Sequence, residues 1–582
     1  MDNDVYCEGT EDKLRKHFTV IYGEDRVDEC MERIQMHINK FGLKPEEKIP
    51  VQDHWTHEDH ILITYGDMVQ PRQGEPVSML HKQHQFLHKY LRNTLSSVHI
   101  LPFFPSSSDD GFSVIDYRRV DERIGGWDDI QELSSEFRLM GDLVMNHISR
   151  HSEWFKKYLK KEEPYTDFFI EVEPDVDLSM VTRPRSTALL TPVHTKKGEK
   201  FVWSTFSDDQ IDVNFSNPDV LFEYLDIFFY YLSKGLTIIR LDAVAFIWKE
   251  LGTSCIHLDQ THEIVKLMRT LTDCFAPHAT IITETNVPHK ENISYFGDGD
   301  ETHMVYLFSL PPLLLHAILT ENASYLTEWV KSLNRLPFGC TYFNFTASHD
   351  GIGVRPLEGL VPQEEFDELV SDIKKKGGFV SEKKNPDGTL SPYELNITFF
   401  DAFSALNGNQ SLQIRRYLCS QILMLSFKGV PGIYFHNLLA TPNNIQGVSI
   451  TGRYRTINRK KWHYDELEEE LSDPDTTTHR VFYKLKEIIK KRKKHPAFHP
   501  FGWQQVYDID PDIFCLLRWD PDKTEQVLVL ANVTDNVRKV DFSGNSIPIE
   551  RGKEYSDILS GRKLFANGKA ELKPFEVIWI KV

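Results

Sequence analysis

Short apolar segments rich in β-branched residues alternate with longer amphipathic segments along most of the chain. Eight such runs lie at residues 61–67, 98–104, 139–147, 236–246, 280–286, 304–310, 341–350 and 430–435. The runs have the length of strands, and most segments between them read as helices. Eight strand–helix repeats predict an α/β fold, the (β/α)8 TIM barrel. A doubly wound sheet is the alternative, but residues 61–75 lack the glycine-rich phosphate turn that it would place after its first strand.

The pattern changes at both ends of this region and once inside it. Residues 1–58 are charged, with apolar side chains at a roughly helical spacing, so we expect a helical leader packed on the main body. The segment from about 150 to 235 is longer than one helix needs, which predicts an inserted subdomain over the barrel mouth. Short strands such as IFCLLRWD and FEVIWIKV predict a C-terminal β-sandwich at 500–582. The catalytic barrel would then occupy 59–499.

Composition and charge exclude several classes of protein. A chain of 582 residues suggests two to four domains, and its formal net charge of −19 makes it a poor general binder of nucleic acid. The N-terminus has no apolar stretch after a basic start, so no secretory signal is expected. The most apolar long segment, at 306–319, is interrupted by Pro311 and Pro312 and is too short to span a bilayer. We therefore expect a cytoplasmic protein without a membrane or nucleic-acid partner.

The cysteine and histidine spacings favour neither a disulfide framework nor a metal site. The seven cysteines are scattered and form no CxxC pair, so we expect mostly buried, reduced thiols. Two histidine sets have ligand-like spacings along a helix, namely His54, His57 and His60, and His81, His84 and His88. No carboxylate or cysteine partner set is evident for either of them, and we predict no metal.

Three carboxylates mark the candidate chemistry, because each follows an apolar run. Asp242 ends TIIRLD, Glu284 ends TIITE and Asp350 ends TYFNFTASHD. A barrel gathers the ends of its strands at one mouth, and cleavage of a glycosidic bond with retention needs one carboxylate as nucleophile and another as acid/base. Arg240, on the same face of its strand as Asp242, would keep that carboxylate ionised. Taken singly, each carboxylate also fits a structural role, as a buried ion pair, an exposed glutamate or a turn residue.

The segments DLVMNH, IIRLDAV, TETN and ASHD, in this order, resemble the four barrel-strand motifs of the α-amylase clan, glycoside hydrolase family thirteen. The resemblance implies a (β/α)8 barrel with an inserted B domain and a C-terminal β domain. It also implies that Asp242 is the nucleophile, Glu284 the acid/base and Asp350 the stabiliser of the transition state. The residues that it implies as binders of the glucosyl unit are His147, Arg240 and His349.

Further segments resemble the sucrose phosphorylase subfamily, among them RPR at 183–185, KELGTSC, FSLPPLLLHA, SHDGIG and INRK. That similarity implies Asp109 and Arg459 as ligands of the buried glucose and an apolar platform of Phe112 and Phe206. It implies Arg185 on the acceptor side, where phosphate and the leaving sugar or acid bind.

The chain departs from true sucrose phosphorylases at Tyr393-Glu394, where they carry Tyr-Gln, in the loop RPRSTALLTPV, and in its leader. In these respects it is similar to the glucosylglycerate phosphorylases. The similarity implies reversible phosphorolysis of 2-O-α-glucosyl-glycerate to α-glucose 1-phosphate and D-glycerate by double displacement. No metal or organic cofactor is implied, since inorganic phosphate is itself a substrate, and a homodimer is plausible by analogy. Glu394 would oppose an anionic acceptor if it pointed inward, so we expect it to point away or to bind a hydroxyl.

Other functions stay open. The nearest are phosphorylases of sucrose, sucrose 6-phosphate or glucosylglycerol. An α-glucosidase or transglucosidase would release glucose or build oligosaccharides without phosphate. A non-catalytic binding barrel ranks last, because all three carboxylates are present.

Overall fold

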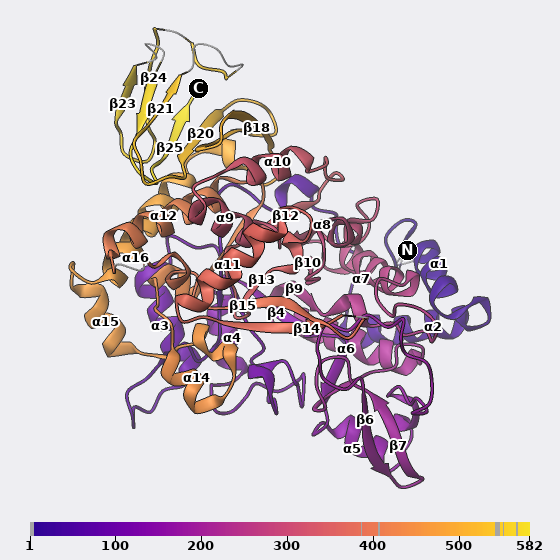
Figure 1. Cartoon of the computed structure of the whole chain (residues 1–582). Coiled ribbons are helices and arrows are strands. Elements are labelled where there is room, and N and C mark those ends of the chain that lie inside the picture. The colour runs from indigo at the N-terminus through magenta and orange to yellow at the C-terminus, as the bar shows by residue number, and fades with distance from the viewer. Residues whose placement is uncertain (1–4, 386, 406–407, 542–546, 551, 566–568) are drawn as a thin grey trace.

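The computed structural model describes residues 5–385, 387–405, 408–541, 547–550, 552–565 and 569–582. Its centre is a closed barrel of parallel strands in the order β1-β16-β12-β11-β10-β9-β4-β3 (Figure 1). The strands are β1 (Ile61–Thr64), β3 (Ser97–Ile100), β4 (Arg138–Val144), β9 (Leu236–Asp242), β10 (Thr280–Thr283), β11 (Met304–Tyr306), β12 (Thr341–Asn344) and β16 (Val430–Tyr434). Each of the eight apolar runs supplies one strand, so the predicted barrel is confirmed. The runs are apolar throughout because helices cover the outside while side chains fill the interior.

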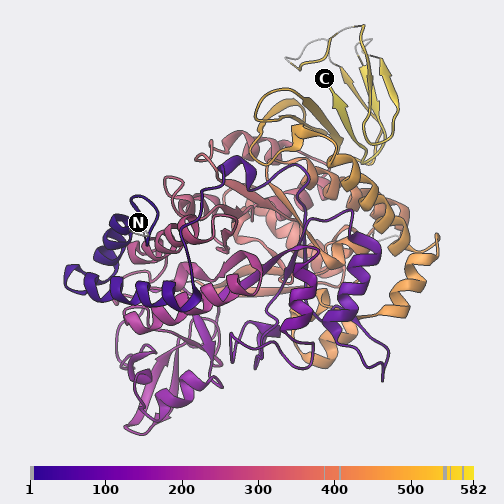
Figure 2. The same cartoon turned by 180° about the vertical axis from the view of Figure 1, so that it is seen from behind.

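Helices surround the barrel in both views (Figures 1 and 2). The longer ones are α3 (Met79–Leu91), α6 (Pro218–Ser233), α7 (Asp259–Phe275), α9 (Leu310–Leu319), α12 (Gln410–Ser426) and α16 (Thr477–Arg492), and α4 (Trp127–Ser134) is a short one. The local sequence explains, for example, where helix α6 begins. Asn217 accepts a hydrogen bond from the first turn of α6, and Pro218 occupies the position where a missing N–H costs nothing. The shorter elements are β2 (Val69–Gln70), α8 (His289–Asn292), α10 (Ser324–Ser332), α13 (Phe435–Leu439), α14 (Ile445–Thr451), β17 (Trp462–His463) and α15 (Tyr464–Ser472).

Two long segments between barrel strands carry their own strands. Between β4 and β9 lie β5 (His147–Ser149), α5 (Glu153–Leu159), β6 (Leu190–Thr195), β7 (Gly198–Trp203) and β8 (Gln210–Asp212). A separate apolar cluster that includes Val172, Leu189 and Trp203 supports this part. Between β12 and β16 lie β13 (Ile352–Gly353), α11 (Gln363–Lys375), β14 (Phe379–Lys384) and β15 (Leu390–Asn396), whose strands form one sheet in the order β13-β15-β14. The sequence did not predict this second sheet.

The C-terminal region is strand-rich. An antiparallel sheet joins β18 (Trp503–Asp510), β19 (Ile513–Trp519), β20 (Gln526–Asn532) and β25 (Val577–Lys581). Two smaller sheets pair β21 (Arg538–Asp541) with β24 (Lys569–Leu572) and β22 (Glu554–Ser556) with β23 (Lys563–Phe565). This region and the segment inserted before β9 lie on opposite sides of the barrel in both views (Figures 1 and 2). Among the described residues, no helix combines the length and the apolar character needed to cross a membrane.

The N-terminal segment packs on the outside of the barrel as two helices, α1 (Thr10–Tyr22) and α2 (Val27–Phe41). Helix α1 lies on α7, where His17 contacts Glu263 at 2.6 Å. Helix α2 lies on α6, where Arg33 is 2.8 Å from Asp219. The segment therefore braces the two helices that precede β9 and β10.

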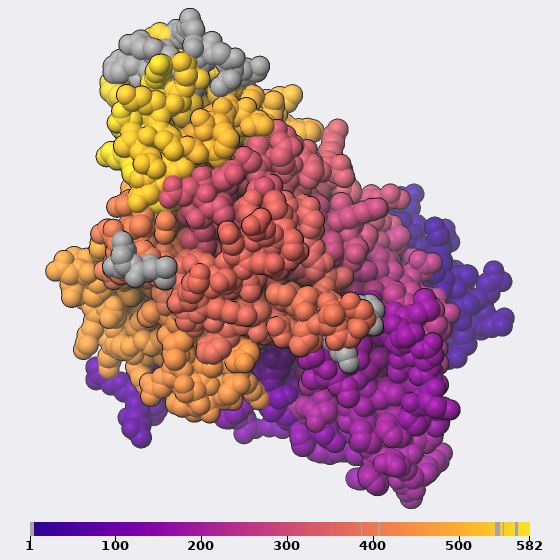
Figure 3. Space-filling model, in the orientation of Figure 1, coloured from indigo at the N-terminus to yellow at the C-terminus, as the bar shows by residue number. Residues whose placement is uncertain are grey.

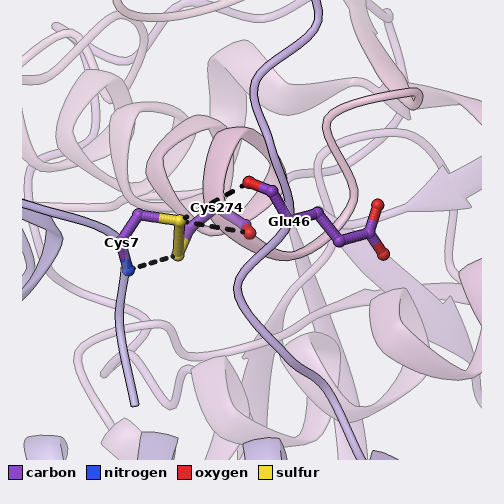
Figure 4. Close-up of a disulfide and its surroundings, with 3 residues drawn as sticks. All are labelled: Cys7, Glu46 and Cys274. Atoms are coloured by element: carbon purple, nitrogen blue, oxygen red, sulfur yellow. Dashed lines mark hydrogen bonds between the residues drawn. A yellow bond between two sulfur atoms is a disulfide. The ribbon is translucent and has the colours of Figure 1, made fainter. Parts of the chain in front are cut away.

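A disulfide fastens the same segment, and here the expectation of reduced thiols was wrong for two cysteines. Cys7 is bonded to Cys274, near the end of α7, across a sequence separation of 267 residues (Figure 4). The backbone N–H of Glu46 donates to the carbonyl of Cys274 at 3.0 Å, so both ends of the helical pair meet the same turn. The other five cysteines are buried and free, as expected. Pairing over such a distance leaves no local sequence signal.

A buried arginine ties the C-terminal sheet to the barrel. The guanidinium of Arg518, on β19, donates to the carbonyls of Ser426 at 2.8 Å, His499 at 3.0 Å and Trp503 at 3.1 Å. No part of the Arg518 side chain is exposed to solvent. One guanidinium thus binds three carbonyl groups where the C-terminal sheet meets the barrel.

We predict that Arg518→Ala lowers the free energy of unfolding by at least about 3 kcal/mol, because buried acceptors left unpaired cost roughly 1–3 kcal/mol each. Thermal unfolding followed by circular dichroism measures the loss. Arg480→Ala, an exposed arginine on α16, is the matched control. Equal melting temperatures for the two variants would contradict the role given to Arg518.

Candidate active site

The carboxyl ends of three barrel strands bring the predicted carboxylates into one pocket. Asp242 is the last residue of β9, Glu284 follows β10 directly, and Asp350 lies six residues after the end of β12. All three line the same pocket at the barrel mouth. The surface is hollowed between the region of α14, in orange, and the inserted segment, in magenta (Figure 3).

The guanidinium of Arg240 holds the first two carboxylates together. Its Nη1 lies 2.6 Å from Oδ1 of Asp242 and also contacts Asp142, and its Nη2 lies 3.9 Å from Oε2 of Glu284. Asp142 on β4 pairs in register with Arg240 on β9, so both side chains point into the barrel. Asp142 in turn contacts His99 at 2.7 Å. The backbone N–H of Ala243 donates to Glu284 at 3.4 Å.

These contacts decide which carboxyl holds a proton. Burial raises the pKa of Asp242, Arg240 opposes that rise, and the Glu284 carboxylate adds to it. Burial likewise raises the pKa of Glu284. Two carboxyls that raise each other's pKa compete for one proton and titrate as a pair. Arg240 touches Asp242 but stays 3.9 Å from Glu284, so its contact favours the ionised form of Asp242 over that of Glu284.

Asp350 has a different electrostatic environment. Its Oδ1 lies 2.6 Å from Nη1 of Arg455, 3.8 Å from Nη2 of Arg459 and 3.4 Å from Nε2 of His349. Burial opposes ionisation, but Arg455 and Arg459 outweigh it and hold the pKa of Asp350 below its ordinary value. Asp350 is therefore a permanent anion in the pocket.

Two histidine–phenylalanine pairs line the inner part of the pocket. His349 stacks on Phe112 with ring centroids 4.6 Å apart, and its buried Nδ1 has no partner in the described part of the chain. His147 lies beside Phe206 at 5.1 Å, and its Nε2 donates to the carbonyl of Phe112 at 3.0 Å. Burial lowers the pKa of both imidazoles, which are neutral and able to exchange hydrogen bonds with hydroxyl groups.

Of the predicted pair Asp109 and Arg459, only Asp109 lines this pocket, but both line a pocket that adjoins it. Asp109 lines the pocket and accepts a hydrogen bond from Gln210 at 3.3 Å. It has a φ of 51°, a conformation enforced by the tight segment before Gly111, where an added Cβ would meet the carbonyl of Pro102 at 2.6 Å. Arg459 does not line this pocket; it pairs with Asp110 and donates to the carbonyl of His349 at 2.8 Å.

The predicted residues Arg185 and Tyr393 both line the pocket, whereas Glu394 does not. The Arg185 guanidinium is 5.6 Å from the centroid of the Tyr393 ring, and its Nη1 is 3.9 Å from Oε2 of Glu394. Glu394 is only 1% exposed and accepts hydrogen bonds from Nε and Nη2 of Arg455, each at 3.0 Å. It also accepts from the backbone N–H of Gly351. The negative charge of Glu394 is therefore neutralised by partners within the protein.

Gln210, Asn286, Arg355 and Arg455 are among the residues of the wall that sequence reasoning missed. Arg455 precedes Arg459 by four residues in RYRTINRK, and its spacing from a predicted site residue was a signal that could have found it. Asn286 follows Glu284 by two residues. Nothing local marks Arg355, whose place on the wall depends on the β13–β15 sheet.

The histidines on α3 have carboxylate neighbours after all, so the reason given for excluding a metal there was wrong. The atoms of His84, His88 and Glu136 lie within 4.8 Å of one another, as do those of His81, Asp129 and Glu132. Contacts already join these side chains in pairs, for example His84 to Glu136 at 2.9 Å, and Arg92 lies 3.1 Å from Glu136. The carboxylates come from α4 and the turn after it, which is why spacing within α3 did not reveal them.

Comparisons with known proteins agree with the geometry. Residues 88–350 match the catalytic domain of the α-amylase family. The chain is 45% identical to a glucosylglycerate phosphorylase of Spirochaeta thermophila over 98% of each chain. It is 45% identical to a glucosylglycerate phosphorylase of Escherichia coli over 91% of this chain and 92% of the other. The crystal structure of a sucrose 6F-phosphate phosphorylase from Thermoanaerobacter thermosaccharolyticum has the same fold, with a TM-score of 0.71 at 24% identity over 89% of this chain and 98% of the other.

The shared proton gives a test that needs no substrate. We predict that Asp242→Asn lowers the pKa of Glu284, because it removes a neighbouring negative charge and leaves Arg240 with one carboxylate fewer. An infrared difference titration follows the carboxyl band, which Glu284→Gln assigns. The control is Asp473→Asn, at an exposed position. A pKa of Glu284 that stays constant or rises in Asp242→Asn would contradict the shared proton.

Proposed function

This chain belongs to the α-amylase family, and we propose that it is a retaining phosphorylase that splits 2-O-α-glucosyl-D-glycerate with inorganic phosphate. The observation that carries the proposal is the 45% identity to glucosylglycerate phosphorylases over nearly the whole chain. The pocket supports it with two carboxyl groups beside one guanidinium that contacts one of them directly and the other only at 3.9 Å, and a double displacement needs such a pair in different protonation states.

In the first step the Asp242 carboxylate attacks the anomeric carbon, and Glu284 gives its proton to the departing oxygen. D-Glycerate leaves, and a β-glucosyl ester remains on Asp242. Phosphate then enters from the face that glycerate vacated, and Glu284, now a carboxylate, takes its proton. The phosphate oxygen attacks the anomeric carbon and releases Asp242. Two inversions give α-glucose 1-phosphate with the configuration of the substrate.

The surrounding residues have distinct parts in this scheme. Arg240 keeps Asp242 ionised and aimed, because it binds the carboxylate at 2.6 Å in a buried site. Asp350, held as an anion by Arg455, grips ring hydroxyls and stabilises positive charge that develops at the anomeric carbon. His147 and His349 bind hydroxyls of the glucosyl unit, Asp109 and Phe112 complete its site, and Arg459 supports that site through Asp110.

Phosphate has to approach a pocket rich in carboxylates, so a cation must receive it. Arg185 lines the pocket and contacts no carboxylate closer than 3.9 Å in the described residues. A guanidinium matches two oxygens of a phosphate at once. Phosphate is a substrate in this scheme, and every proton that moves belongs to Glu284 or to a substrate.

The cytoplasmic location remains an expectation, and a disulfide is uncommon in a reducing compartment.

The deciding assay is the purified protein with α-glucosyl-glycerate, with and without phosphate. We predict glucose 1-phosphate that depends on phosphate and little free glucose. Sucrose, sucrose 6-phosphate and glucosylglycerol are the comparison donors, and each should react more slowly. Glucose released at the same rate without phosphate would mean a hydrolase, and a faster reaction with sucrose would move the chain to the sucrose phosphorylases.

The pH dependence separates the two carboxylates. Burial raises the pKa of Glu284, so its protonated form persists to higher pH and the first step slows as the pH rises past that value. We predict that α-glucosyl fluoride, whose leaving group needs no proton, loses this alkaline limb and still reacts in Glu284→Gln. Asp242→Asn should be inactive with either donor while melting within a few degrees of the parent. Turnover in Asp242→Asn would remove the nucleophile from the scheme.

A further inference from the structure

Three arginines line the pocket, namely Arg185, Arg355 and Arg455. An anionic acceptor requires a cation, but a guanidinium that already neutralises a protein carboxylate has little attraction left for a ligand. The ionic partners of each arginine therefore indicate which one is available.

Each guanidinium nitrogen of Arg455 already contacts a carboxylate of the protein. Its Nε and Nη2 each bind Glu394 at 3.0 Å, and its Nη1 lies 2.6 Å from Asp350. Moving it toward a ligand would take the nearest cation away from both Glu394 and Asp350. Arg455 organises the wall and does not receive the acceptor.

Arg185 has one carboxylate nearby, but at a longer distance. Glu394 lies 3.9 Å from its Nη1, and the ring of Tyr393 lies beneath its guanidinium at 5.6 Å. The single negative charge of Glu394 is thus shared between Arg455 and Arg185. Arg185 retains some capacity for an anion, which suits a substrate that enters and leaves, such as phosphate.

Arg355 differs from both. Within the described residues its side chain forms no ion pair, and its Nε is buried without a hydrogen-bond partner. The neighbouring imidazole of His257 is no counterion in either protonation state, and because burial lowers its pKa to about 4, it adds no second positive charge either. A partly buried guanidinium without an anion is costly, and a bound carboxylate would remove that cost.

Arg355 lies on the side of the pocket that holds Glu284, the proposed acid/base. Gly353, two residues earlier, packs so closely on Asn286 that an added Cβ would lie 2.9 Å from its amide nitrogen. Asn286 follows Glu284 by two residues, lines the same wall, and has a buried Oδ1 without a partner in the described residues. Since the leaving oxygen takes its proton from Glu284, the acceptor must lie on this side. A free cation and a free hydrogen-bond acceptor there complement the carboxylate and a hydroxyl of a short hydroxy acid.

We propose that Arg355 is the specificity-determining residue that binds the acceptor's carboxylate, with the Asn286 amide accepting from an acceptor hydroxyl. The inference rests on the proposed phosphorylase function. It attributes to Arg355 the preference of the enzyme for an acidic acceptor over a neutral polyol. Glucose transfer itself does not need Arg355, which lies outside the set that holds the glucosyl unit.

The test runs the reaction toward synthesis, with glucose 1-phosphate as donor and either D-glycerate or glycerol as acceptor. Arg355→Gln should lower kcat/KM for glycerate by roughly 10- to 100-fold, the range expected for one charge-assisted contact, mostly through a higher KM. The value for glycerol should change less than about threefold, so the preference for glycerate collapses. Arg355→Lys keeps the charge and should recover part of the preference.

Hydrolysis of glucose 1-phosphate in the Arg355 variants reports on the glucosyl site and on folding without any acceptor. Arg185→Gln is the matched variant on the same wall, and it should keep the glycerate-to-glycerol ratio within about threefold of the parent. An unchanged ratio in Arg355→Gln, or a ratio lost in Arg185→Gln instead, would overturn the assignment. If the parent protein makes no glucosylglycerate at all, the proposed function fails, which is a different result from an unchanged ratio in an active parent.

Discussion

The buried guanidinium of Arg240 is the interaction on which the rest of the site depends. It is 3% exposed and lies among Asp142, Asp242 and Glu284. A buried cation needs carboxylates or carbonyls around it, and buried carboxylates need a cation or hydrogen-bond donors. In the barrel interior, Arg240 is the common partner of all three carboxyl groups. The same contact that stabilises this network favours the ionised form of Asp242 over that of Glu284, so stability and chemistry share one residue.

Parallel strands make this network possible. Asp142 pairs in register with Arg240, and Val144 pairs with Asp242, so residues far apart in sequence meet on the inner face of neighbouring strands. The leader reinforces these strands indirectly, because α1 packs on α7 and α2 packs on α6. Its disulfide to Cys274 fixes the turn that leads into β10. Helices without a catalytic residue thus brace the strands that carry Asp242 and Glu284.

The parts of this structure that the sequence predicted are those with local signals. An apolar, β-branched run followed by a carboxylate marks both a barrel strand and a candidate catalytic group, which is why Asp242 and Glu284 were found with their strands. The Cys7–Cys274 bond and the carboxylates facing His84 and His88 were missed because each joins elements that no local pattern connects. The β13–β15 sheet was missed as well, and with it the position of Arg355.

The buried Glu394 explains how a pocket for an anion can contain an additional carboxylate. Its charge would repel an acidic acceptor if it stood alone, but Arg455 binds it through two nitrogens and Arg185 approaches it from the other side. Glu394 therefore reduces the attraction of those two arginines for a ligand and leaves Arg355 as the cation on this wall without an ionic partner in the described residues. Selection of an anion in this pocket follows from which guanidinium lacks a carboxylate, and not from how many arginines line the wall.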